Sequence, residues 1–74
     1  MTKKEYTEYL ERLNNSDLKK HAVNTLLKEQ LGIRIPDWMI EVLYNICLMR
    51  DEKIYLDSMG EATQHIMKLR ETAD

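Results

Sequence analysis

The amino-acid sequence predicts an all-α fold, a small compact bundle of about four short helices with a central apolar third helix. Apolar residues recur at intervals of three and four in several segments, which is typical of amphipathic helices. Only two glycines and one proline interrupt 74 residues, and 43% of the residues are hydrophobic. A β-rich fold would need more turn residues, and a disordered chain would have fewer hydrophobic residues, so the composition disfavours both. We therefore expect one helical domain over residues 1–74.

The first helix is expected over residues 3–13. Thr2 and Glu5 have the spacing of a capping box, in which each side chain bonds the backbone N–H of the other residue. The apolar side follows at helical spacing and consists of Tyr6, Tyr9, Leu10 and Leu13.

The second helix is expected over residues 17–31, with Ser16 as its N-cap. Its apolar stripe consists of Leu18, Ala22, Val23, Leu26, Leu27 and Leu31. Gly32 stands where a left-handed residue ends many helices, and Ile33 could then fold back onto Leu27.

The third helix is expected to begin near Pro36, because proline is preset for a first helical turn. One apolar face comprises Trp38, Met39, Val42, Leu43, Ile46, Cys47 and Met49, and a second comprises Ile40, Tyr44 and Leu48. A helix that is apolar nearly all round belongs in the middle of a bundle. The other helices should therefore pack around it.

Residues 51–57 allow two interpretations, a continuation of the third helix or a connector, and we favour the connector because residues 50–53 are polar. Ser58 and Glu61 have the form of a second capping box. A fourth helix, with the stripe Met59, Ala62, Ile66 and Leu69, should then extend to about residue 71.

Composition argues against several classes of protein. The net charge is −2, from 11 basic and 13 acidic residues mixed along the chain, so no general field attracts nucleic acid or an anionic membrane. The uncharged apolar stretch over residues 42–49 is far shorter than the roughly 20 residues of a membrane span. A single cysteine, Cys47, excludes an internal disulfide, and we see no export signal. We expect a cytoplasmic protein.

No group of residues predicts catalysis, and we expect no enzyme, no cofactor and no metal. Cys47 has apolar helical neighbours and should be an inert buried thiol. Asp17 with His21, and Glu61 with His65, offer two metal ligands each, which is too few for a zinc site, and solvated side-chain pairs are the favoured interpretation. Glycine-rich phosphate loops are missing from the sequence.

Excess apolar surface on the third helix leads to the main functional hypothesis. We expect a small regulator or inhibitor, of the kind that bacterial and phage genomes encode, which docks an apolar and aromatic patch on a partner protein of unknown identity. The expected partner-binding residues are Trp38, Ile40, Tyr44, Leu48 and Tyr55. The oligomeric state stays open between a homodimer through this face and a monomer.

The alternative is a small dimeric regulator that binds DNA in the manner of a helix-turn-helix protein, with the fourth helix in the groove. Its candidate contacts are Lys19, Lys20, Arg34, Gln64, Lys68 and Arg70. Nearby acidic residues weaken this hypothesis, because they repel phosphate.

Overall fold

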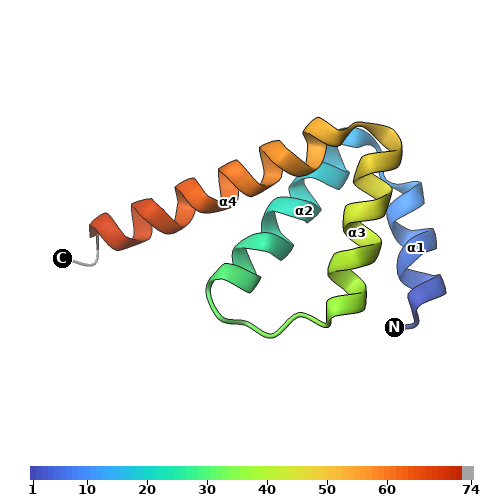
Figure 1. Ribbon diagram of the computed structural model, residues 1–74, viewed down its shortest axis with the longest axis horizontal. Helices are drawn as coiled ribbons and strands as arrows, with labels where there is room; N and C mark the ends of the chain where they lie inside the picture. Colours follow the sequence, from blue (N-terminus) through green and yellow to red (C-terminus); the bar gives the residue numbers. More distant parts are fainter. Residues whose placement is uncertain (73–74) are drawn as a thin grey trace.

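The computed structural model describes residues 1–72, and this part of the chain contains four helices: α1 (Lys3–Arg12), α2 (Asn15–Gln30), α3 (Asp37–Arg50) and α4 (Glu52–Thr72). The all-α prediction is confirmed. In Figure 1, α1 and α3 lie side by side, and the last turns of α4 extend beyond the other helices. α2 packs chiefly against α4, whereas α3 packs against both α1 and α4.

The central position of α3 follows from what it buries. The core cluster consists of Tyr6, Leu10, Leu18, Ala22, Val42, Leu43, Ile46, Cys47 and Ile54. Four of these nine residues belong to α3, so this helix supplies more of the core than any other. Burying a large aliphatic side chain contributes about 1.5–3 kcal/mol.

The capping box of α1 is confirmed. The backbone N–H of Glu5 donates to Thr2 Oγ1 at 3.1 Å, and the N–H of Thr2 donates to Glu5 Oε1 at 3.1 Å. These hydrogen bonds lower the pKa of the Glu5 carboxyl below its usual value.

The N-cap predicted for α2 is wrong by two residues, and its C-terminal stop is confirmed. Asn14 Oδ1 accepts a hydrogen bond from the N–H of Asp17 at 2.8 Å, so the helix begins one residue before Ser16. At the other end Gly32 adopts a φ of 88°, and the N–H of Ile33 donates to the carbonyl of Lys28 at 2.9 Å. This is a Schellman stop, which requires a left-handed residue at its centre.

The predicted connector over residues 51–57 is wrong, because α4 begins at Glu52, directly after α3. Asp51 alone joins the two helices, with an extended φ of −167°. Its N–H still donates to the carbonyl of Cys47 at 2.8 Å, while its side chain accepts from the N–H of Lys53 at 3.0 Å. One aspartate therefore ends α3 and caps α4. A sequence search for glycine and proline turn residues does not detect such a junction.

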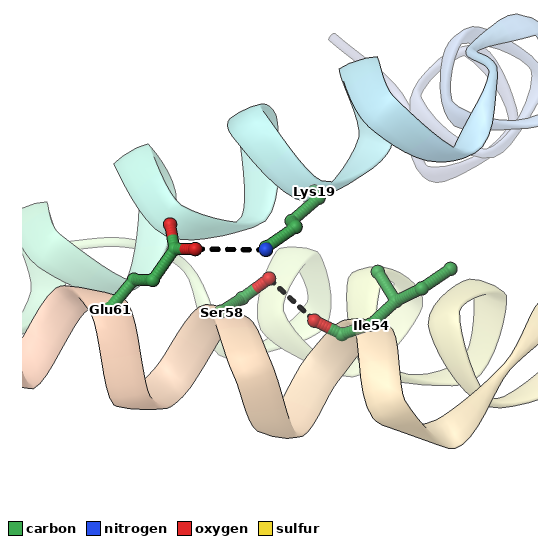
Figure 2. A network of polar contacts seen from close by, with 4 residues as sticks. All are labelled: Lys19, Ile54, Ser58 and Glu61. Atoms are coloured by element: carbon green, nitrogen blue, oxygen red, sulfur yellow. Dashed lines mark hydrogen bonds and ion pairs between the residues drawn. The ribbon is translucent and has the colours of Figure 1, made fainter.

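The capping box predicted at Ser58 and Glu61 is wrong for the same reason, since both residues lie inside α4. Ser58 is fully buried, and its hydroxyl donates to the carbonyl of Ile54 at 2.6 Å, one turn earlier (Figure 2). Ala62, one turn further on, is also fully buried, as is Ala22 of α2. These small side chains leave room for the close contact between α2 and α4.

An arginine joins the end of α3 to the end of α1. Arg50 donates from Nη2 to the carbonyls of Leu10 at 3.2 Å and Glu11 at 2.9 Å, and from Nη1 to the carbonyl of Leu13. The last carbonyls of a helix lack partners within the helix and carry its negative dipole end. The guanidinium fork satisfies several of them at once.

Candidate interaction surface

Two tyrosines from different helices form the centre of an exposed aromatic surface. Tyr44 of α3 and Tyr55 of α4 pack edge to face, with ring centroids 4.8 Å apart and planes at 86°. The single-residue link at Asp51 brings their helices together. Edge-to-face pairs stabilise each other beyond the area that they bury, so the two rings hold a defined arrangement.

This surface, called here the aromatic patch, consists of Ile40, Tyr44, Leu48 and Tyr55. The three α3 residues lie four positions apart and so share one side of the helix. Tyr44 remains 42% exposed and Leu48 39% exposed, while Ile40 and Tyr55 are half-buried. The structure thus brings together four of the five residues predicted to bind a partner.

Trp38, the fifth predicted anchor, lies elsewhere. Its ring packs edge to face on Tyr6 of α1, with centroids 5.9 Å apart, and it is half-buried against the core. It therefore stiffens the contact between α1 and α3. A sequence pattern cannot separate the two positions, because Trp38 and Ile40 both lie on apolar sides of the same helix.

Acidic side chains border the aromatic patch. Asp37 and Glu41 precede Tyr44 by seven and three residues and lie on the same side of α3, where both are exposed. The sequence contains no lysine or arginine over residues 35–49. Burial and then the nearby charge of Glu29 raise the pKa of Tyr55 above its usual value. The local field at the patch is therefore negative.

Met59 extends the apolar surface on α4; the sequence pattern placed it in the stripe of the fourth helix but not one turn from Tyr55. It follows Tyr55 by four positions on the same helix and is 43% exposed. The missing information was the start of α4, because only a helix that includes Tyr55 places Met59 one turn beyond it.

The residues proposed for DNA contact are partly brought together, at the junction of α2 and α4. Three shallow hollows, of 410, 220 and 380 Å³, adjoin there and share Glu61 in their walls. Their walls also include Lys19, Lys20, Gln64 and Lys68. Lys19 Nζ lies 2.8 Å from Glu61 Oε1 (Figure 2), and this contact raises the pKa of the lysine. Arg34 lies in the loop after α2, and Arg70 in the last turn of α4.

His21 is a half-buried side chain and not one of a solvated pair with Asp17 as expected. Its Nε2 lies 2.8 Å from the hydroxyl of Tyr6 and 3.5 Å from that of Thr25. Burial, followed by the charge of Lys28, lowers the pKa of His21. Burial raises the pKa of Tyr6 to about 12. His21 is thus a packing partner of α1.

The remaining candidates for chemistry are in structural positions. Cys47 is fully buried, as expected, and burial raises the pKa of its thiol. Within the described residues, no three histidine, cysteine or acidic side chains gather as a metal site would require. None of the four helices, over the residues described, is both long and apolar enough to cross a membrane.

Comparison with known proteins gives no relative from which a function could be transferred. The chain matches no protein-family model, no curated protein and no solved structure. Inference about function therefore depends on the aromatic patch and on the polar hollows.

Proposed function

We propose that this chain is a non-enzymatic protein-interaction module, a regulator or inhibitor, which docks its aromatic patch on a basic amphipathic segment of a partner protein. The observation that carries the proposal is the edge-to-face pair of the exposed Tyr44 and the half-buried Tyr55, beside acidic side chains. We place this activity in the cytoplasm, where the lone thiol of Cys47 stays reduced.

The packing of the patch favours binding. Tyrosine is enriched among the residues that dominate interface energies, because it offers a large contact area at a small entropic cost. The two helices that carry the patch are joined by one residue, so no loop has to become ordered when a partner binds. A preformed surface of this kind binds more tightly than a flexible one with the same contacts, because no free energy is lost in ordering it.

Charge specifies the partner. Asp37 and Glu41 border the patch, and α3 has no cation before Arg50, which is engaged by α1. A basic partner gains electrostatic attraction, whereas an acidic one is repelled. For the same reason the patch does not fit a second copy of itself. An amphipathic helix with lysines beside its apolar stripe has the matching chemistry.

The test uses two synthetic amphipathic peptides with the same leucine positions, one with lysine and one with glutamate at the polar positions. Each is titrated into the ¹⁵N-labelled protein and followed by NMR. We expect the lysine peptide to shift the amide signals of Tyr44, Leu48 and Tyr55, and the glutamate peptide to leave them in place. Equal responses to both peptides, or shifts confined to another surface, would contradict the proposal.

A second candidate function is DNA binding through the junction of α2 and α4. It is favoured by the hollows, which bring Lys19, Lys20, Gln64 and Lys68 to one surface. Two observations weigh against it. Glu61 pairs with Lys19, and Asp57 lines a neighbouring hollow, so anionic groups occupy the same surface as the cations.

Salt dependence separates the two functions. DNA binding through lysines should weaken steeply between about 50 and 200 mM salt, because neutralised phosphates release counterions. Fluorescence anisotropy with a labelled duplex, for the unaltered protein and for Lys20→Glu, measures this directly. Salt-insensitive or absent binding would exclude the DNA-binding function. It would not bear on the proposal that the aromatic patch binds a protein.

A further inference from the structure

A second stripe of exposed side chains runs along α4, apart from the aromatic patch. It borders α2, because Gln30 Nε2 donates to Thr63 Oγ1 at 3.5 Å, and Leu56 and Gly60 line a hollow together with Lys19. Leu56, Gly60, Thr63 and Met67 follow one another at intervals of four, three and four, so they form one stripe along the helix. Leu56 and Met67 are each 56% exposed, and the two residues between them are exposed as well. Tyr55 points about 100° away from Leu56 around the helix axis, so the stripe and the aromatic patch can be occupied separately.

Gly60, in the middle of this stripe, is not required by the fold of the chain itself. Its φ is not positive, and a Cβ atom placed on it would meet no atom within 4 Å outside its chain neighbours and the adjoining backbone of its own helix. Glycine is the least favourable residue after proline inside a helix, and Gly60 lies well within the 21 residues of α4. Neither backbone geometry nor packing within the chain explains a glycine at this position. Glycine also occurs where the backbone of another molecule approaches closely, and this is the explanation that we adopt for Gly60.

The charges at the two ends of the stripe are self-complementary. Glu52 and Arg70 are 18 residues apart, as are Lys53 and Glu71, and 18 residues make five full turns. Each pair therefore lies on one side of the stripe, with opposite charges at opposite ends, and all four residues are exposed. An antiparallel copy of α4 places Glu52 against Arg70 of the second chain, and Lys53 against its Glu71.

We propose that two copies of this chain associate through this stripe of α4, antiparallel, about a two-fold axis near residues 61 and 62. Leu56 of each chain then packs on Met67 of the other, and Gly60 faces Thr63, where the helices approach most closely. In a parallel pair about a two-fold axis along the helices, Glu52 would instead face Lys53 of the second chain, and the two helix dipoles would point the same way. The antiparallel arrangement aligns the two helix dipoles favourably.

A single helix face is small beside the roughly 800 Å² per partner of a standard interface. The dimer should therefore form and dissociate with protein concentration. Sedimentation equilibrium over a range of concentrations should show a mass that rises from the 8.8 kDa of one chain toward twice that value.

The first variant that tests the proposal is Gly60→Lys. Lysine is a better helix former than glycine and has open space at this position, so the helix should be kept, while a charged side chain enters the centre of the pair. We expect a folded protein that stays monomeric at every concentration. An unaltered protein that is itself monomeric throughout, or a Gly60→Lys protein that still associates, would overturn the proposal.

Charge exchange tests the register. Glu52→Arg and Arg70→Glu should each weaken association at least fivefold, and the double variant should restore it. Orientation is tested with Leu56→Cys and Met67→Cys proteins, which should form a disulfide-linked pair when mixed. Cross-linking of Leu56→Cys alone at the same rate would show a parallel pair and contradict the antiparallel one.

Discussion

The Nη2 atom of Arg50 donates a hydrogen bond to the carbonyl oxygen of Glu11 at 2.9 Å, across 39 positions of sequence. This contact fastens the last turn of α3 to the last turn of α1, on the side where Asp51 turns the chain into α4. The guanidinium thus holds the end of α1 against the end of α3, and α3 carries three residues of the aromatic patch.

Replacement of Arg50 should cost stability. We expect Arg50→Ala to lower the free energy of unfolding by about 2–3 kcal/mol, because several charge-assisted hydrogen bonds to helix-end carbonyls are lost together. Arg50→Lys should recover only part of this, since an ammonium group cannot replace a planar fork. Urea unfolding followed by circular dichroism gives both values. The exposed Arg12, replaced by alanine, serves as the matched control and should change stability by about 0.5 kcal/mol or less. Equal losses for the two arginines would refute the role of Arg50.

The start of α4 is tested by a pair of alanine variants. Asp51→Ala removes the side chain that accepts from the N–H of Lys53 and should cost about 1 kcal/mol. Ser58→Ala should be nearly neutral, because alanine suits a helix interior and the lost hydroxyl bonds only a carbonyl of its own helix. If Ser58 were the cap, the order of the two losses would be reversed. Thermal unfolding of both variants decides between the two positions.

Close packing at Ser58 predicts a larger effect for a bulkier residue. Ser58 has no exposed surface, and α2 packs chiefly against α4, so Ser58→Leu should destabilise the fold by about 1–3 kcal/mol through overpacking. The exposed Met59 provides a neighbouring control, where Met59→Leu should be tolerated. A stable Ser58→Leu protein would show that the contact between α2 and α4 is looser than described.

Stability should depend on pH through His21. Folding lowers its pKa, so the unfolded chain binds more protons, and stability should fall as pH decreases through the usual histidine range toward the lowered value. Between pH 8 and 5.5 the unaltered protein should lose more stability than His21→Gln. Parallel profiles for the unaltered protein and His21→Gln would show that the contact with Tyr6 does not depend on the charge of the imidazole.

Charge exchange beside the aromatic patch should alter the choice of partner. Asp37→Lys combined with Glu41→Lys replaces two exposed carboxylates by ammonium groups next to Tyr44. The double variant should bind the leucine and lysine peptide more weakly than the unaltered protein and the leucine and glutamate peptide more strongly. Isothermal titration calorimetry with both peptides measures the exchange. Unchanged affinities would mean that charge does not select the partner.

Hydrophobic spacing and residue preferences were enough to predict the fold class and three of the four helices, with the capping box at Thr2 and the left-handed stop at Gly32. They failed at residues 51–57, because a lone aspartate can end one helix and start the next without glycine or proline. That error moved Ser58 from the interior to a cap and hid the relation between Tyr55 and Met59. Arg50 was also missed, since its acceptors are backbone carbonyls distant in sequence, which leave no trace in a pattern of side chains.

The aromatic patch was predicted in part, because the four-residue spacing of Ile40, Tyr44 and Leu48 defines one side of a helix. Whether such a side is covered depends on where the other helices lie. Trp38 shows the limit of the pattern, because it packs on Tyr6. The self-complementary ends of α4 became apparent only once the helix was known to begin at Glu52.

Binding through the aromatic patch is tested most directly by comparing two tyrosines of similar exposure, Tyr44 at 42% and Tyr9 at 44%. Tyr44→Ala and Tyr9→Ala are measured for affinity to the leucine and lysine peptide, with circular dichroism as the check that both remain helical. We predict that Tyr44→Ala weakens binding by about tenfold or more, near 1.4 kcal/mol, and that Tyr9→Ala changes it little. Equal effects in two folded variants would contradict the assignment of the aromatic patch as the binding surface.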